Sequence, residues 1–199
     1  MPLNQRFGRS LVLALAVFAA APAVALEIRN LEITREGDRY RVNFDVLVPV
    51  PVARAQALLR DYRQWPHLSD TMKESRLLET LADGRQHVRI VFHSCVLLFC
   101  KDIRQTKELD IRQDGDIRAV MLPAQSDFTY GWEHWQIRPA NAMTRIQYQA
   151  EFAPAFALPP VIGPWILKAR LRQKLILTAE RLEVLQVEQT ERPSPRPAD

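Results

Sequence analysis

A long amphipathic segment near the C-terminus, residues 159–186, limits the folds that this chain can adopt. Pro160 and Pro164 suit the first turn of a helix, where a missing N–H costs nothing. Beyond them, apolar residues recur at steps of three and four on one helix face: Leu167, Leu171, Leu175, Leu182 and Leu185. Charged residues, Lys174 among them, are expected on the remaining surface. A helix of about 40 Å then needs a broad apolar partner.

The chain before this helix supplies mainly strands. Alternation of apolar and polar residues predicts strands at residues 26–34, 39–48, 73–81, 85–95, 101–112, 116–122, 128–138 and 143–152. Turn sequences such as Glu36-Gly37-Asp38 separate them, and a short helix is predicted at residues 52–62. One solvent-exposed polar face and one buried apolar face are typical of antiparallel sheets. We therefore expect an α+β fold, in which a curved antiparallel sheet wraps around the C-terminal helix.

Residues 1–25 have the pattern of a secretory signal peptide. Arg6 and Arg9 form a basic region, residues 11–21 are apolar, and Ala23-Val24-Ala25 supplies the small residues of a cleavage site. The apolar run is shorter than the ~20 residues that span a bilayer. We expect cleavage after Ala25 and a periplasmic or secreted mature chain; an uncleaved membrane anchor is the alternative.

The remaining chain reads as one domain, residues 26–187, followed by a proline-containing tail at residues 188–199 that we expect to be disordered. Loss of Arg6 and Arg9 with the signal peptide lowers the formal net charge from +4 to +2. No run of five like charges occurs in the chain. Near-balanced charge argues against nucleic acid as a partner.

Two cysteines, Cys95 and Cys100, lie five residues apart. On a straight strand they would be about 16 Å apart and on opposite faces, whereas a disulfide needs Cα atoms within about 7 Å. A bridge therefore requires the chain to turn between them. Because unpaired thiols are uncommon in exported proteins, we favour the bridge; two buried free thiols on one continuous strand are the alternative.

Several sequence features resemble one known superfamily over residues 40–186. They are the strand and helix at residues 46–59, the corner DYRQWP at residues 61–66, Gly131-Trp132-Glu133 with Trp135, and the closing helix after Ile162-Gly163-Pro164. The chain resembles the START-related helix-grip (SRPBCC) superfamily, in the branch of polyketide cyclase/dehydrase and coenzyme-Q-binding proteins. The leading strand, the signal peptide and the cysteine pair suggest an exported subgroup.

The resemblance implies an apolar ligand held between the closing helix and the sheet. Alternation and the helix stripe give the inward-facing candidates for that site: Val88, Ile90, Phe92, Met121, Trp135, Ile137, Ile146, Tyr148, Phe152, Leu167 and Leu171. The same side chains could instead fill a solid core. Polar contacts are expected from Tyr148 and from the rim at Trp65 and His67.

Two residues are candidates for acid–base chemistry. His67 follows Pro66 at the expected rim, and Glu133 shares its side of the strand with Trp135 and Ile137. An inward Glu133 would be a buried carboxylate, which raises the pKa of such a group. The sequence contains no nucleophile elbow or phosphate loop, and its cysteines and histidines match no metal-binding spacing. We expect no cofactor and no metal.

A bridged hairpin would carry Val96, Leu97, Leu98 and Phe99 at its tip, as a possible contact for a membrane or a partner protein. The leading hypothesis is an exported protein that binds a lipid, a quinone or a polyketide-like molecule. The alternatives are a cyclase- or dehydratase-type enzyme that uses Glu133 or His67, and a partner-binding module without a ligand.

Overall fold

The computed structural model describes residues 25–96, 99–156 and 163–190. They form one eight-stranded antiparallel sheet, two α-helices and two short 3-10 helices. In chain order the elements are β1 (Glu27–Glu36), β2 (Arg39–Val48), α1 (Val52–Arg60), η1 (Tyr62–Leu68), β3 (Met72–Thr80), β4 (Gln86–Val96), β5 (Phe99–Ile111), β6 (Asp116–Met121), η2 (Pro123–Gln125), β7 (Phe128–Ala140), β8 (Met143–Pro154) and α2 (Gly163–Thr190). No helix in this part of the chain combines the length and the hydropathy needed to cross a membrane.

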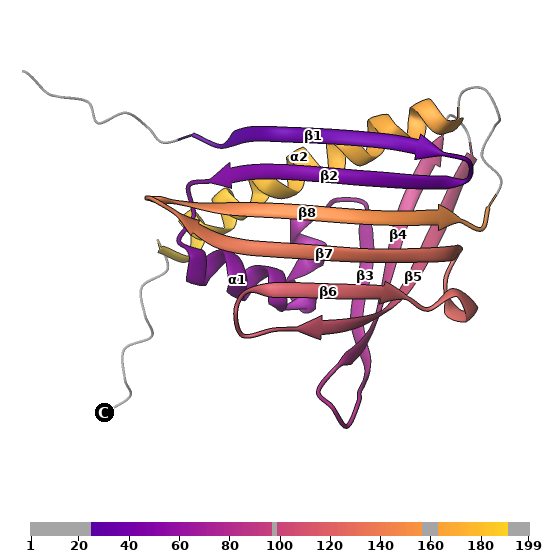
Figure 1. Cartoon of the computed structure of the whole chain (residues 1–199), viewed down its shortest axis with the longest axis horizontal. Helices are drawn as coiled ribbons and strands as arrows, with labels where there is room; N and C mark the ends of the chain where they lie inside the picture. The colour runs from indigo at the N-terminus through magenta and orange to yellow at the C-terminus, as the bar shows by residue number, and fades with distance from the viewer. Residues whose placement is uncertain (1–24, 97–98, 157–162, 191–199) are drawn as a thin grey trace, which may run out of the picture.

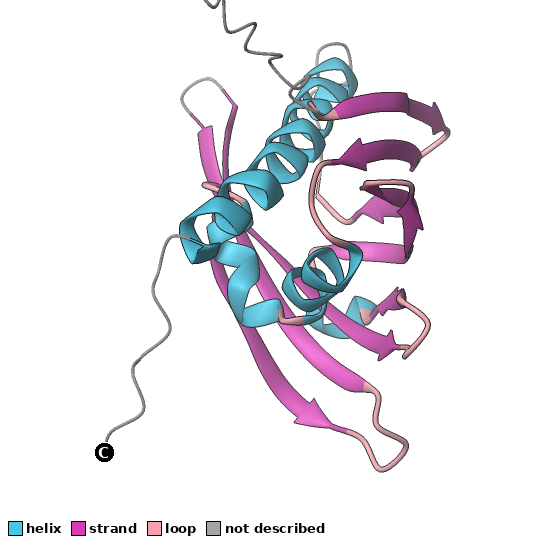
Figure 2. Ribbon diagram, turned by 90° about the vertical axis from the view of Figure 1, so that its left-hand side faces the viewer, coloured by secondary structure: helices cyan, strands magenta, loops and turns pink. Residues whose placement is uncertain are grey.

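The sheet is strongly curved, and α2 lies along its concave side. The strand order is β1-β2-β8-β7-β6-β5-β4-β3, so the N-terminal hairpin is joined to the last strand. In Figure 1 the strands β1, β2, β8, β7 and β6 run nearly parallel across the view, whereas β3, β4 and the first part of β5 cross them steeply. Figure 2 shows α2 between these two limbs of the sheet. The predicted helix-grip fold is confirmed.

Strand alternation determines which face of the sheet is buried. In β2, Tyr40, Val42, Phe44, Val46 and Val48 are all buried, and the polar residues between them are not. The outer face carries ion pairs between neighbouring strands, and Arg39 and Arg41 both bind the Glu151 carboxylate of β8. Hydrogen bonds from these guanidinium groups lower the pKa of Glu151. The alternation therefore places the apolar residues against α2, as predicted.

The short helix α1 closes one end of the curved sheet. Its Gln56 side chain donates a hydrogen bond to the carbonyl of Ile137, at 3.2 Å. The turn at Gly115 passes directly beneath this contact, because a Cβ at Gly115 would lie 2.8 Å from the same carbonyl oxygen. Gly115 also has a φ of +93°, which favours glycine. Close packing at this turn holds α1 against β7.

The C-terminal half of α2 is anchored in a solid core. Ala179 and Leu182 are each 2% exposed. They pack in one cluster with residues of α1 and of the adjoining sheet. The helix continues to Thr190, past the predicted end at Gln186 and into the first residues of the predicted tail. The rest of that tail, like residues 1–24 of the predicted signal peptide, lies outside the described residues.

Candidate functional site

A cavity of about 510 Å³ lies between the N-terminal half of α2 and the concave face of the sheet. Most of its wall is aromatic and aliphatic. The sequence-predicted residues that line it are Phe92, Met121, Trp135, Tyr148, Phe152, Leu167 and Leu171. Trp65 of the predicted rim also lines it. Volumes of this size are typical of sites for small molecules, so the interior of this fold has room for a ligand.

Four of the predicted ligand residues do not line the cavity. Val88, Ile90, Ile137 and Ile146 are almost fully buried and belong to the core cluster. They point to the concave side, as alternation predicts. They lie in the packed core of that side, however, where α1 and the C-terminal half of α2 contribute side chains. Alternation identifies the face of a strand but not the depth of the space above it, so these positions are corrected to core residues.

A buried ion pair stands in the cavity wall. Lys107 of β5 donates a hydrogen bond to the Glu133 carboxylate of β7, and the two side chains are only 5% and 15% exposed. Both strands pair with β6, where Met121 lies beside Lys107 and Ala119 lies beside Glu133. The small Ala119 side chain leaves room for the ion pair to form across β6. Glu133 therefore faces the interior, as predicted, but with a cation beside it that the sequence analysis missed.

Tyr148 adds a phenol group next to this ion pair. Its ring packs against Trp135, with the ring centroids 4.1 Å apart. Burial raises the pKa of the Tyr148 phenol well above its usual range, and the negative charge of Glu133 raises it further. The hydroxyl thus keeps its proton and is directed at the Glu133 carboxylate.

Lys174 enters the same cavity from α2, which corrects its predicted place on the helix surface. It lies next to Leu175 and three residues after Leu171, so it belongs to the inward stripe of the helix. Its Nζ is 2.9 Å from the centroid of the Phe92 ring, a cation–π contact. Burial lowers the pKa of Lys174 well below its usual value, and repulsion from Lys107 adds to this effect.

Of the four histidines, all of them among the described residues, only His93 lines the cavity. The His67 side chain is exposed and does not line the cavity, although its backbone carbonyl accepts a hydrogen bond from Arg181. The imidazoles of His87 and His134 are hydrogen-bonded to the carboxylates of Glu79 and Asp116, at 2.6 and 2.9 Å. Neither of them is a cavity residue. Of the two predicted acid–base candidates, only Glu133 has the required position.

The two cysteines are bonded to each other. Cys95 and Cys100 are paired residues of the β4–β5 hairpin, and their sulfur atoms are 2.05 Å apart. This is the alternative that the sequence favoured. The side chains of Val96, Leu97, Leu98 and Phe99 at the hairpin tip lie outside the described part of the structure. Their contact with a membrane or a partner protein therefore stays a prediction.

A curved antiparallel sheet that encloses a cavity under a long C-terminal helix defines a protein of the START-like helix-grip class. Solved structures share this fold. A START superfamily protein from Mycobacterium smegmatis has a TM-score of 0.59 at 20% identity and covers 75% of this chain and 98% of its own. The Zhui aromatase/cyclase from Streptomyces sp. R1128 has a TM-score of 0.61 at 16% identity, with 77% and 96% covered.

A third similar structure is a STAR-related lipid transfer protein from Xanthomonas axonopodis, with a TM-score of 0.55 at 14% identity and coverage of 77% and 97%. Identities this low establish the fold alone. The sequence itself matches the model of a family described as polyketide cyclase / dehydrase and lipid transport, over residues 48–176. Since this match spans more than half of the chain, the protein belongs to that family. A comparison with curated proteins finds no match.

Proposed function

We propose that this protein is an exported binding protein that holds a lipid, a quinone or a polyketide-like molecule non-covalently in the cavity beneath α2. The observation that carries the proposal is a mostly apolar space of about 510 Å³ whose wall includes the Lys107–Glu133 ion pair, Tyr148 and Lys174. Burial of an apolar ligand there stabilises the complex by about 25 cal/mol for each Å² removed from water. The family match and the lipid-transport part of its description support this reading.

The polar cluster indicates what the ligand carries besides its apolar body. Lys107 is neutralised by Glu133, whereas Lys174 contacts an aromatic ring. The cavity wall thus holds a lysine for which a ligand oxygen is a better partner than a ring. A carboxylate or a carbonyl oxygen near Lys174 would satisfy it, and the apolar body would lie against Phe92 and Trp135. The ligand is accordingly an amphiphile with one oxygen-bearing head.

Export is the second part of the proposal, and it rests on the sequence of residues 1–25. Within the START-related superfamily, the resemblance of the sequence favours the coenzyme-Q-binding branch and an exported subgroup. Expression of the full chain in a bacterium, followed by fractionation and N-terminal mass analysis, tests the location. We expect a periplasmic or secreted product that begins at Leu26. A product that retains Met1 in the membrane fraction would instead support an uncleaved anchor.

Ligand binding is tested by native mass spectrometry of the purified protein, before and after incubation with a long-chain fatty acid and with the corresponding alcohol. Binding of either probe at one molecule per chain is expected. Leu171→Trp, which places a larger side chain in the cavity, should weaken it markedly. Arg172→Trp, at the next and exposed position of α2, is the matched control and should bind normally. Equal binding by the two variants would contradict the cavity as the site.

The role of Lys174 is tested with the same two probes. Hydrogen bonds to charged groups contribute about 1.5–3 kcal/mol, so Lys174→Met should weaken fatty-acid binding roughly 10-fold or more. Binding of the alcohol should change much less. Lys168→Met, on the same helix but not in the cavity wall, is the control. If both lysine variants bind the fatty acid like the wild type, the head does not lie at Lys174.

A cyclase- or dehydratase-type activity is the alternative, and the inward carboxylate of Glu133 favours it. Held between Lys107 and Tyr148, this carboxylate can exchange a proton with a bound carbonyl compound. Incubation with a linear polyketone thioester, followed by absorbance and mass, tests the alternative. Product formation that Glu133→Gln abolishes, while substrate binding persists, would establish an enzyme. Binding without turnover supports the carrier.

A further inference from the structure

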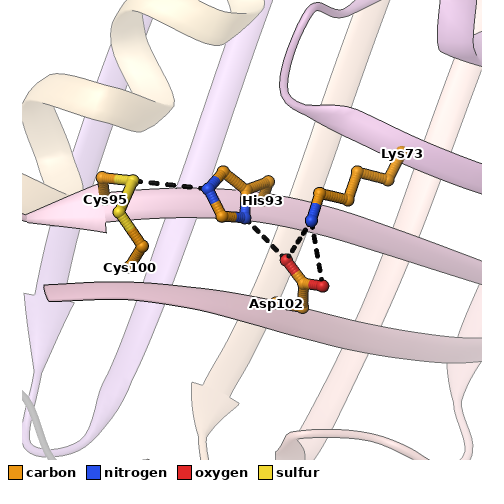
Figure 3. Close-up of a disulfide and its surroundings, with 5 residues drawn as sticks. All are labelled: Lys73, His93, Cys95, Cys100 and Asp102. Atoms are coloured by element: carbon orange, nitrogen blue, oxygen red, sulfur yellow. Dashed lines mark hydrogen bonds and ion pairs between the residues drawn. A yellow bond between two sulfur atoms is a disulfide. The ribbon is translucent and has the colours of Figure 1, made fainter.

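Four side chains form two neighbouring cross-strand pairs on the β4–β5 hairpin. In the strand register His93 lies opposite Asp102, and Cys95 lies opposite Cys100. Figure 3 shows the His93 ring between the disulfide and the Asp102 carboxylate. We propose that the dithiol form of this hairpin binds a zinc ion, or another thiophilic metal ion, through Cys95 Sγ, Cys100 Sγ and His93 Nε2. His93 and Cys95 also line the ligand cavity, but this inference does not depend on what that cavity binds.

The three ligand atoms are already close together. All of them lie within 4.8 Å of one another, and His93 Nε2 is 3.4 Å from Cys95 Sγ. With zinc bonds of about 2.0–2.1 Å to nitrogen and 2.3 Å to sulfur, tetrahedral geometry separates nitrogen and sulfur by about 3.6 Å and two sulfurs by about 3.8 Å. The His93–Cys95 separation thus already matches one edge of the tetrahedron. Once the disulfide is broken, the two sulfurs have to move apart and Cys100 Sγ has to reach a similar distance from His93 Nε2.

The ring of His93 is held in the orientation that a metal ligand needs. Its Nδ1 lies 2.6 Å from Asp102 Oδ1, and Lys73 Nζ binds both oxygens of that carboxylate, at 3.0 and 3.1 Å. A carboxylate on one ring nitrogen directs the other nitrogen to the metal and makes it more basic, as in many zinc sites. Here the other nitrogen, Nε2, faces sulfur.

A second histidine on the same strand lacks this arrangement. His87 Nδ1 contacts Glu79 at 2.6 Å, and His87 Nε2 contacts Glu108 at 3.3 Å. Both of its ring nitrogens are therefore occupied by carboxylates, and no cysteine lies opposite it in the strand register. His87 is consequently the matched control for His93.

The chemistry of the site follows from its ligand set. Two thiolates and an imidazole select zinc or another thiophilic ion over magnesium or calcium. Binding to the dithiol releases the two thiol protons, and three protein ligands leave a fourth position for water. The disulfide is the alternative state of the same pair. A thiol reductant converts the Cys95–Cys100 disulfide to the dithiol by supplying two electrons. Two reductant thiols then become one disulfide, and each of the two cysteines gains a hydrogen.

The test uses the full protein, reduced with a phosphine and freed of metal, and titrated with cobalt(II) as a coloured substitute for zinc. Tetrahedral thiolate absorption at one ion per chain is expected, with zinc displacing the cobalt. His93→Gln should weaken binding at least 10-fold. Asp102→Asn, which keeps all three ligands and tests positioning, should weaken it roughly 10-fold. His87→Gln and the wild type should bind alike, and the oxidised protein should not bind.

Two results would overturn the proposal. The first is the absence of cobalt absorption in wild-type protein that has two titratable thiols and a native circular-dichroism spectrum. The second is equal affinity of His93→Gln and His87→Gln, which would show chelation by two thiols alone. Because Asp102→Asn retains both cysteines and His93, its affinity decides the question even if another variant fails to fold.

Discussion

At the residue scale, the cavity places two lysines and one glutamate among aromatic side chains. Lys107 and Glu133 form a direct ion pair, whereas Lys174 is not directly paired with a carboxylate among the described residues and is attracted by Glu133 and Asp70 only at longer range. A charge that is removed from water without a carboxylate partner lowers stability. Such a cost in the empty protein is typical of a group that is kept for ligand recognition.

We predict that Lys174→Met stabilises the empty protein at neutral pH. The folded state holds the pKa of Lys174 below the ordinary lysine value of about 10.4. Between these two pKa values the unfolded chain binds more protons than the folded chain, so wild-type stability rises with pH across that window. The Met variant lacks this rise, and its advantage should shrink as the pH approaches 10. Urea unfolding at a series of pH values measures the difference.

Lys168→Met is the control for this prediction, because Lys168 does not line the cavity. A pH-dependent gain in stability that both variants share would not come from the cavity. A constant difference between Lys174→Met and the wild type would mean that Lys174 titrates normally in the folded protein.

The buried ion pair gives a second prediction at this scale. Glu133→Leu leaves Lys107 buried without its partner, which should cost about 3 kcal/mol of unfolding free energy. The double variant Lys107→Met/Glu133→Leu removes both charges and should recover most of that loss. Asp110→Asn breaks the exposed Arg112–Asp110 pair and should cost no more than about 1 kcal/mol. Additive effects in the double variant would show that the buried pair is not coupled.

At the element scale, α2 has two halves with different partners. Ala179 and Leu182 of its C-terminal half pack into the solid core. Leu167, Leu171 and Lys174 of its N-terminal half cover the cavity instead. A helix face over an empty space lacks packing contacts, so that half has less tertiary stabilisation. The same helix therefore serves as an anchor at one end and as a cover at the other.

We predict that stability depends on the anchored half of α2. Leu182→Ala should lower the unfolding free energy by about 3 kcal/mol, because it removes a buried side chain. Val184→Ala, two residues further on at a position that is 53% exposed, should change it by less than about 0.5 kcal/mol. Thermal or urea unfolding measures both values. Similar losses in the two variants would contradict the anchor.

The sequence predicted the order and type of the strands and helices, but not which part of the concave face is hollow. Phe92 and Ile90 have the same parity on β4, yet the first lines the cavity and the second is packed in the core. What separates them is the position of α1 and of both halves of α2, which depends on contacts between distant segments. The position of Lys174, in contrast, could have been predicted, since it adjoins Leu175 and lies one turn from Leu171.

At the scale of the whole molecule, a ligand that binds only the folded state raises its stability. A fatty acid at 100 times its dissociation constant adds about 2.7 kcal/mol. For a domain of this size, the midpoint of thermal unfolding should then rise by about 5–10 °C. Calorimetry of the wild type with and without the fatty acid measures this shift. Leu171→Trp, which narrows the cavity, should show a smaller shift, and a shift of equal size there would place the ligand elsewhere.

The pairing of β2 with β8 can form only late in biosynthesis. Arg39 and Glu151, which form an ion pair across these strands, are 112 residues apart. At about 5–20 residues per second, the ribosome needs roughly 6–20 s to make the intervening chain. Until β8 emerges, β2 can pair with β1 but not with its second neighbour in the sheet. A nascent chain of this protein thus offers holdase chaperones an interval of many seconds in which to bind it.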